Sequence, residues 1–303
     1  MGVVRGGQVR PLRAGVTMLE LLARSGGDLV AAAEAAGDDR AAARGIETVH
    51  LLAPLPRPAT VRDFMTFESH VAGVRGPDRP VPDQWYEAPA FYFTNPDAVL
   101  GPADPVPVPP GCELFDLELE VAAVIGREVA DPTPEEAETA IAGYTILIDW
   151  SARDVQWAEM QVGLGPAKGK DGATTLGPVL VTADEVARWR SGTSFALEME
   201  ALVNGAPIGG DSLDSMAYSF GDMVAYAARG TRVRPGDVLG SGTCGGGCLA
   251  ELWGRQGFGA HPPLRPGDEV TVRVEALGAM TLHVVGGVAP VPVGPARRGR
   301  PRS

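Results

Sequence analysis

Acidic side chains interrupt an apolar, strand-like run near the middle of the chain. Residues 116–121 read Asp-Leu-Glu-Leu-Glu-Val, and the run continues with apolar residues to Ile125. Alternate residues of a strand share one face, so Glu118 and Glu120 point the same way while their apolar neighbours point into a core. Buried carboxylates that lie together need a positive partner, and a divalent cation is the simplest one. The run therefore predicts a buried strand that contributes to a cation site.

Length and charge narrow the class of protein. The chain has 303 residues, 45% hydrophobic and 21% charged, which suffices for one large domain with a small appendage. Its net charge of -12 argues against nucleic acid or an anionic membrane surface as a partner, because both favour a basic face. Every apolar run falls short of the roughly 18 residues that a membrane span needs. A small molecule held through a metal ion agrees with this charge.

The cysteines indicate a reducing compartment. Cys112, Cys244 and Cys248 contain no Cys-X-X-Cys pair and cannot form an even disulfide framework. The first 13 residues lack the apolar core of a secretory signal. We therefore expect a cytoplasmic protein.

Three segments are expected along the chain. Residues 1–58 form a small N-terminal cap or extension that ends in a proline-rich linker. Residues 59–290 form the main, catalytic domain. Residues 291–303 form a disordered basic tail with four arginines.

Strands dominate the secondary structure that we expect. The 27 prolines and 40 glycines favour short strands and turns. Asn204-Gly205 predicts a tight hairpin, and Glu198 and Glu200 before it are expected on a solvated face. These patterns predict a strand-dominated α+β fold. Expected strands cover residues 90–93, 117–125, 144–149, 179–182, 196–203, 238–240 and 269–285, and expected helices cover residues 18–23, 29–36, 134–142, 151–160 and 216–229.

Four stretches together resemble the fumarylacetoacetate hydrolase family. They are residues 63–70 (Asp-Phe-Met-Thr-Phe-Glu-Ser-His), 116–120, 149–156 (Asp-Trp-Ser-Ala-Arg-Asp-Val-Gln) and 165–178, which begins and ends with Gly-Pro. Their order and spacing match over about residues 60–285. The resemblance implies a mixed β-roll of the fumarylacetoacetase C-terminal-domain type and a homodimer.

The resemblance also implies a metal site. Oxygen ligands without His or Cys suit Mg²⁺, or else Ca²⁺ or Mn²⁺, and argue against Zn²⁺. Four carboxylates around one divalent ion leave an excess of about two negative charges, so Lys170 and Arg153 are expected as nearby cations. The residues that the resemblance places at this site are Asp63, Glu118, Glu120, Asp149, Lys170 and Thr174.

A histidine is expected as the general base. His70 follows Asp63 at the spacing that the family uses, and histidine side chains exchange protons near neutral pH. Glu251 is similar to the glutamate that orients this histidine. Lys170 and Gln156 are expected to stabilise developing negative charge. The remaining histidines, His50, His261 and His283, are expected to be structural.

The resemblance further implies a substrate pocket. Arg79 is the weaker match to a substrate-binding arginine, because its loop is rich in proline, and Arg75 is the alternative. Met160 stands where fumarylacetoacetase has a tyrosine, so the pocket is expected to differ. The expected pocket residues are Tyr92, Arg79, Arg153, Gln156, Met160 and Thr243.

We therefore expect a divalent-metal-dependent hydrolase that cleaves a carbon-carbon bond in a 1,3-dicarbonyl acid of the fumarylacetoacetate or acylpyruvate type. Water activated by His70 would attack a carbonyl, and the leaving group would depart as an enolate held by the ion. Three alternatives stay open. One is a decarboxylase, isomerase, hydratase or dehydratase with the same enolate chemistry; the second is a non-catalytic metal- or ligand-binding module; the third is an enzyme that uses Cys244.

Overall fold

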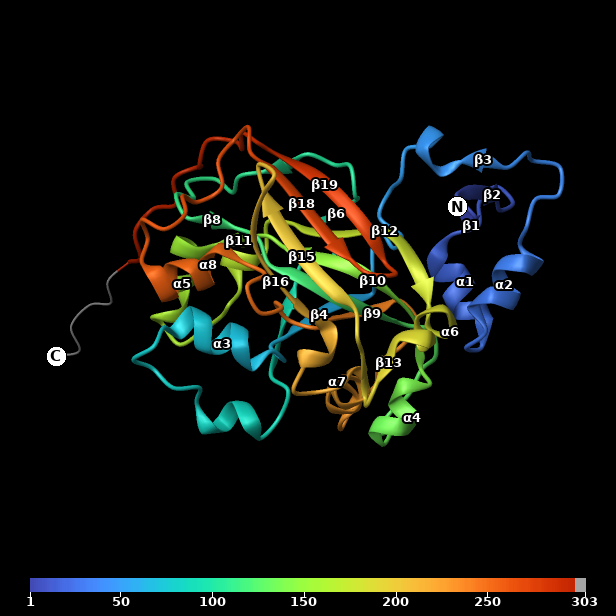
Figure 1. Ribbon diagram of the computed structural model, residues 1–303, viewed down its shortest axis with the longest axis horizontal. Coiled ribbons are helices and arrows are strands. Elements are labelled where there is room, and N and C mark those ends of the chain that lie inside the picture. The colour runs from blue at the N-terminus through green and yellow to red at the C-terminus, as the bar shows by residue number, and fades with distance from the viewer. Residues whose placement is uncertain (298–303) are drawn as a thin grey trace.

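A seven-stranded mixed sheet lies at the centre of the computed structural model, which describes residues 1–297 (Figure 1). In order across the sheet, its strands are β5 (Phe91–Thr94), β4 (Thr60–Phe64), β17 (Asp237–Gly240), β9 (Leu119–Ile125), β10 (Ile141–Asp149), β12 (Thr174–Thr182) and β6 (Val99–Leu100). β17 runs parallel to β4, and β12 runs parallel to β6, while the other neighbours are antiparallel. Strand pairing thus brings segments that are far apart in the sequence side by side.

The central strand β9 separates two hydrophobic cores. All seven of its residues are buried, as expected of a strand that is covered on both faces. Leu119 and Val121 belong to the larger core, whereas Ala122 and Val124 belong to the second core. The predicted alternation is confirmed, and it places Glu120 on the face of Ala122 and Val124.

A second, five-stranded sheet contributes to the larger core. Its order is β16 (Ala206–Ser212), β15 (Glu198–Val203), β18 (Glu269–Val274), β19 (Gly278–Val285) and β7 (Val106–Pro107). The predicted hairpin joins β15 to β16, and Asn204 and Gly205 adopt φ angles of 52° and 76°, which a type I′ turn requires. Glu198 is exposed, and Glu200 pairs with Arg273 at 2.7 Å. The predicted solvated face is confirmed.

Helices and short elements form the connections. The helices are α1 (Met18–Ser25), α2 (Leu29–Ala35), α3 (Glu68–Arg75), α4 (Pro134–Glu138), α5 (Arg153–Met160), α6 (Ala183–Val186), α7 (Phe220–Ala228) and α8 (Leu249–Gln256). Single 3-10 turns are η1 (Ile46–Thr48), η2 (Asp83–Tyr86), η3 (Lys168–Lys170), η4 (Ala187–Trp189) and η5 (Leu213–Ser215). Two small sheets pair β8 (Phe115–Asp116) with β11 (Ser151–Ala152), and β13 (Arg190–Ser191) with β14 (Ser194–Phe195). The strand-dominated α+β class is confirmed. Within residues 1–297, no helix has the length and apolarity to cross a membrane.

Several predicted elements begin or end elsewhere, such as the strand expected over residues 179–182, which begins at Thr174. The helix expected over residues 134–142 ends at Glu138, because the chain from Ile141 onward pairs with β9. The helix expected from residue 151 begins at Arg153, because the two residues before it pair with β8. The helix expected from residue 216 begins at Phe220, after a capping box at Ser219.

The N-terminal segment packs on the second core. It forms a three-stranded sheet of β1 (Gly2–Arg5), β2 (Gln8–Pro11) and β3 (Arg44–Gly45), together with α1 and α2. Leu21 and Leu22 of α1 share this core with Ala122, Val124 and Val238 of the large sheet. Figure 1 shows the segment at the opposite end of the molecule from α3, α5 and α8. The boundary at residue 58 stays a prediction. Residues 291–297 are exposed and lack regular structure, and the rest of the predicted tail lies outside the described residues.

Candidate metal centre and histidine-glutamate dyad

Four buried carboxylates converge at one end of the large sheet. Asp63 and Asp149 lie near the ends of β4 and β10, Glu120 lies in β9, and Glu118 lies in the short link that precedes β9. The Tyr92 hydroxyl oxygen lies 3.0 Å from Asp63 Oδ2 and also contacts Asp149 Oδ2, so its one proton is shared between the two carboxyl groups. The structure thus brings together the four acids that the resemblance implied, and they are called the carboxylate cluster below. Their role as metal ligands stays a prediction.

Two buried cations lie against this cluster. Lys170 is the last residue of η3, and its side chain is buried. Its ammonium group donates to Asp149 Oδ2 at 2.6 Å, to Ser151 Oγ at 2.7 Å and to Glu118 Oε2. The guanidinium of Arg153 donates to Glu118 Oε1 at 2.6 Å. Burial acts to lower the pKa of Lys170, but the surrounding carboxylates outweigh it and raise that pKa above its usual value. A protonated amine has no lone pair, so these contacts favour a charge-balancing role for Lys170, and its role as a metal ligand stays a prediction.

The charges of the cluster are incompletely balanced. Burial disfavours a charged carboxyl group and raises the pKa of Asp63, Glu120 and Asp149, and for each of them negative neighbours raise it further. Burial also acts to raise the pKa of Glu118, but its two bound cations outweigh that effect and hold the pKa well below the usual value. Four acids share two cations, so the cluster keeps a deficit of positive charge.

Unpartnered oxygens show that the cluster fits a metal ion. Glu120 Oε1, Asp149 Oδ1 and Thr174 Oγ1 are buried and accept or donate no hydrogen bond. Buried polar atoms without a partner are rare, and each needs an explanation. Carboxylate and hydroxyl oxygens are the ligands that Mg²⁺, Ca²⁺ and Mn²⁺ prefer. The donor set, its burial and its charge deficit therefore suit a hard divalent cation.

A histidine and a glutamate form a buried pair beside the cluster. His70 in α3 places Nδ1 2.9 Å from Glu251 Oε1 in α8, and its Nε2 lies 3.9 Å from Glu118 Oε1. Glu251 is held in turn by the backbone N–H of Gly246, at 3.0 and 2.9 Å to its two oxygens, and by Arg255 at 2.5 Å. With Glu251 accepting from Nδ1–H, the lone pair lies on Nε2 and faces the carboxylate cluster. This pair is called the dyad below.

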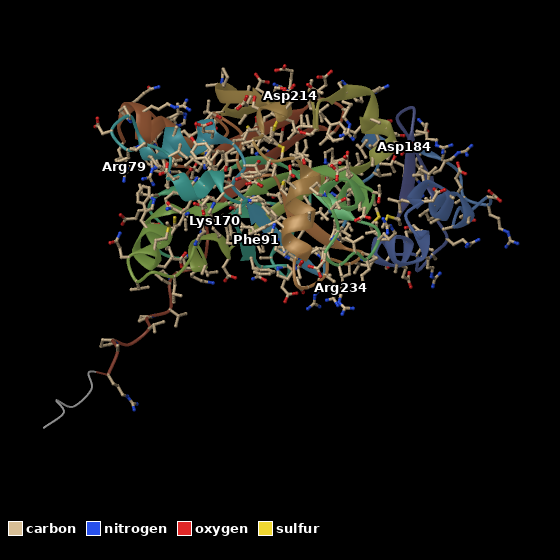
Figure 2. The ribbon with its side chains drawn as sticks, turned by 90° about the horizontal axis from the view of Figure 1, so that it is seen from below. Arg79, Phe91, Lys170, Asp184, Asp214 and Arg234 are labelled. Carbon is tan, nitrogen blue, oxygen red and sulfur yellow. The ribbon has the colours of Figure 1, made fainter. Side chains whose placement is uncertain are left out.

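Some of the predicted pocket residues contact the centre or are buried, whereas others lie at the surface. Tyr92 touches the cluster, and Gln156 Oε1 accepts a hydrogen bond from Arg153 at 3.1 Å, which leaves its amide group free to donate. Thr243 is buried in the turn after β17. Arg79 is exposed and donates to the Arg75 carbonyl at 2.9 Å, and Figure 2 shows it at the surface.

Met160, an expected pocket residue, and Arg75, the alternative to Arg79, make no hydrogen bond to the carboxylate cluster. Met160 ends α5 with 49% of its surface exposed, and Arg75 donates to the Pro80 carbonyl at 2.8 Å. Burial raises the pKa of the Cys244 thiol well above its usual value, which argues against a thiolate nucleophile.

Sequence reasoning assigned no role to Asp116, which connects the cluster to the dyad. Its carboxylate accepts from Arg153 Nη2 at 2.6 Å and from the backbone N–H groups of Leu249 and Ala250 at 2.8 and 3.1 Å. Asp116 thus ties the first turn of α8, which carries Glu251, to the arginine that holds Glu118. The alternation of residues 116, 118 and 120 was a signal for it, because all three fall on one face. Ser151 and Arg255 carried no comparable signal.

Comparison with known proteins places the chain among its relatives. The family model described as "Fumarylacetoacetate (FAA) hydrolase C-terminal" matches residues 59–285. The human protein named oxaloacetate tautomerase FAHD2A, mitochondrial, is 31% identical over 241 residues, which cover 78% of this chain and 70% of that protein.

Solved structures agree with this match. The fumarylacetoacetate hydrolase of Exiguobacterium antarcticum has a TM-score of 0.72 and 26% identity, with 94% of each chain covered. The maleylpyruvate hydrolase of Sphingobium sp. SYK-6, solved with manganese(II) and pyruvate, has a TM-score of 0.70 and 23% identity, covering 95% of this chain and 96% of that one. The second likeness concerns the fold alone. The chain belongs to the fumarylacetoacetate hydrolase family, as its four sequence stretches predicted.

Proposed function

We propose that the protein is a divalent-metal-dependent hydrolase that cleaves a carbon-carbon bond in a 1,3-dicarbonyl acid of the acylpyruvate class. The observation that carries this proposal is the buried dyad, whose Nε2 faces the carboxylate cluster at 3.9 Å. A general base and a hard-cation site side by side are what hydrolysis of a chelating keto acid requires.

The carboxylate cluster would hold the ion, with Mg²⁺ proposed and Ca²⁺ or Mn²⁺ as alternatives. Asp63, Glu118, Glu120 and Asp149 supply the charge, and Thr174, which pairs with Asp149 across β10 and β12, offers the neutral oxygen Oγ1. A divalent ion there supplies Lewis-acid chemistry, polarising the oxygens of a keto acid that chelates it. Burial and mutual repulsion of the carboxyl groups make this centre costly without such an ion.

His70 moves the protons of the proposed reaction. Its Nε2 takes a proton from water, and the resulting hydroxide oxygen bonds to the carbonyl carbon. The carbon-carbon bond then breaks, its electron pair passes to the leaving enolate, and the imidazolium returns the proton to it. Glu251 accepts from Nδ1–H throughout, which fixes the tautomer and stabilises the imidazolium.

Charge on the substrate is met by one fixed positive charge and one free hydrogen-bond donor. Lys170 contributes its positive charge, because its three N–H bonds are already directed at Glu118, Asp149 and Ser151. Gln156 is the free hydrogen-bond donor, because Arg153 holds its oxygen. A donor of this kind typically contributes about 3 to 4 kcal/mol to transition-state stabilisation.

A tautomerase is the second candidate. The relative at 31% identity is named an oxaloacetate tautomerase, and the same dyad moves a proton between carbon and oxygen without a water molecule. The two candidates differ in their products. Hydrolysis yields two acids, whereas tautomerisation interconverts keto and enol forms of one.

One experiment separates these candidates. Proton NMR would follow a panel of acylpyruvates, 3-acyl keto acids and oxaloacetate with the Mg²⁺-loaded protein, with EDTA, and with His70→Ala and Cys244→Ala. New acid signals that require metal and His70 but not Cys244 support the hydrolase. Faster enol-keto exchange without new acids supports the tautomerase. Metal binding with neither activity on any member of the panel contradicts both and favours a binding module.

A further inference from the structure

A buried cysteine lies against the dyad, beside the Nδ1 atom of His70. Cys248 Sγ lies 3.8 Å from His70 Nδ1 and 4.0 Å from Glu251 Oε1, and those two atoms are 2.9 Å apart. All three residues are buried, and one nitrogen, one oxygen and one sulfur atom converge at a single point. The proposed reaction uses the nitrogen and the oxygen but assigns nothing to the sulfur.

The separations suit a zinc ion. Zn–N distances of about 2.0 to 2.1 Å and Zn–S distances of about 2.3 Å place neighbouring donors of a tetrahedral site about 3.3 to 3.6 Å apart. The observed values lie within a few tenths of an ångström of that range. A thiolate, a carboxylate and a neutral imidazole also match the charge and softness of Zn²⁺, whereas Mg²⁺ prefers oxygen ligands.

The three donors are held by rigid elements. Cys248 is the N-cap residue of α8, and Glu251 follows one turn later on the same helix. Arg255 binds the other oxygen of Glu251, Oε2, and so leaves Oε1 directed at His70 and Cys248. Residues from only two packed helices, α3 and α8, therefore build the group.

We propose that His70, Cys248 and Glu251 form a second metal site, selective for a soft divalent cation such as Zn²⁺, and that its occupation switches off the dyad. The inhibitory part rests on the proposed function, while the metal site itself does not. Burial raises the pKa of the Cys248 thiol, so the ion itself must displace the proton, which passes to solvent, because a metal ligand must be a thiolate. The ion takes the Nδ1 lone pair, so the imidazole proton moves to Nε2. The nitrogen that faces the carboxylate cluster then has no lone pair with which to accept a proton from water.

Two selectivities thus meet at one histidine. Nε2 faces a cluster of oxygen ligands suited to hard ions, and Nδ1 faces sulfur and oxygen ligands suited to soft ions. Zn²⁺ inhibition through this site is therefore not a competition with Mg²⁺ for the same ligands.

The binding test uses Co²⁺ as a spectroscopic substitute for Zn²⁺ in the full-length, Mg²⁺-saturated protein. A thiolate bound to Co²⁺ gives a near-ultraviolet charge-transfer band, which oxygen ligands do not give. We expect the band in the original protein, its loss in Cys248→Ser and Cys248→Ala, and its displacement by Zn²⁺. Cys244→Ser is the matched control, because Cys244 is equally buried but outside the group. Circular dichroism shows whether each variant is folded.

The inhibition test measures turnover, relative to each variant's own rate, as Zn²⁺ is added at increasing Mg²⁺. We expect inhibition that Mg²⁺ does not relieve and that weakens at least about tenfold in Cys248→Ser. A band that persists in folded Cys248→Ser, or inhibition that Mg²⁺ relieves in proportion to its concentration, overturns the proposal. A Cys248-dependent band in a protein without turnover on any substrate leaves the metal site in place and contradicts the proposed function instead.

Discussion

At the scale of residues, each titratable group of the centre depends on the charge of its neighbours. Glu118 stays ionised because Arg153 and Lys170 bind it, while Asp63 and Glu120 have raised pKa values through burial and mutual repulsion. His70 is oriented by Glu251, which is itself held by Gly246 and Arg255. The ionised Glu118, the proposed base His70 and the proposed ion site therefore have separate roles, although all of them are buried side by side.

His70→Gln should lower kcat by about 10²- to 10⁴-fold, because the glutamine cannot accept the proton. Glu251→Gln should act in the same direction, since it removes the charge that stabilises the imidazolium. Mg²⁺ affinity, measured by isothermal titration calorimetry, should change little in His70→Gln. His283→Gln, at an exposed position of β19, is the control. A His70→Gln enzyme with the original kcat would exclude His70 as the base.

The metal-free protein should lose stability as pH rises above the range in which carboxyl groups of an unfolded chain titrate. Asp63, Glu120 and Asp149 have pKa values in the folded protein above those of the unfolded chain, so the folded state binds their protons more tightly. That contribution is fully present below the unfolded pKa, near 4, and is lost as pH rises through the folded pKa.

Thermal melts in EDTA between acidic and neutral pH would measure this loss. Excess Mg²⁺ should restore the melting temperature more at neutral than at acidic pH, because protons and the ion compete for the same oxygens. The triple variant Asp63→Asn, Glu120→Gln, Asp149→Asn is the control, and its EDTA melts should depend less on pH. A melting temperature in EDTA that rises throughout this range contradicts the assignment.

At the scale of elements, close packing of strands positions the carboxylates. Gly240 in β17 lies between β4 and β9, and an added Cβ would meet Glu120 Oε2 at 2.5 Å and Asp63 Cγ at 3.5 Å. An added methyl group would therefore collide with the Glu120 carboxylate, whereas its contact with Asp63 would be an ordinary one. Gly242, two residues later, donates its backbone N–H to the same Glu120 oxygen at 3.0 Å.

Gly240→Ala should displace the Glu120 carboxylate and weaken Mg²⁺ binding about 10- to 100-fold, as lost support of a ligand commonly does. The loss should appear in calorimetric titrations and in the Mg²⁺ concentration needed for half-maximal activity. Gly286→Ala is the matched control, because nothing lies within 4 Å of its added Cβ. Unchanged Mg²⁺ affinity in a folded Gly240→Ala protein would show that Glu120 does not bind the ion.

At the scale of the whole molecule, the N-terminal segment and the large sheet share one hydrophobic core. Leu22 is fully buried among residues of both parts. The N-terminal segment lies at the opposite end of the molecule from α3 and α8 (Figure 1). We therefore expect it to contribute to the stability of the large sheet. A homodimer, a cytoplasmic location and a small-molecule keto acid as substrate stay predictions.

Leu22→Ala should lower the free energy of unfolding by about 2 to 5 kcal/mol through the cavity that it leaves. All five tryptophans lie outside residues 1–58, so their fluorescence in urea reports on the main domain alone. We expect their unfolding midpoint to fall with Leu22→Ala, because the two parts unfold together. Leu19→Ala, at an exposed position of α1, should shift it little. An unchanged tryptophan midpoint with Leu22→Ala would mean that the N-terminal segment unfolds independently.

The sequence by itself determined the family, the strand-dominated class and the acids that meet at the centre. Alternation in residues 116–125 is a local property, because the backbone of a strand imposes it. The four motif stretches could likewise be recognised in the sequence alone. Hairpin turns such as Asn204-Gly205 are equally local. Helix ends were less well predicted, because Ile141 joins a strand through pairing with a distant segment.

Only the tertiary structure decided how the charges are shared. His70 and Glu251 are 181 residues apart in sequence, and the contact that Asp116 makes with Leu249 spans 133 residues. Such contacts depend on which strands and helices pack together, and no local pattern encodes them. The same reason explains why Lys170 became a charge-balancing cation, why Arg79 remained at the surface, and why Cys248 came to lie against the dyad. Composition and periodicity predict which side chains are buried, but only the packing of strands and helices decides which buried side chains contact one another.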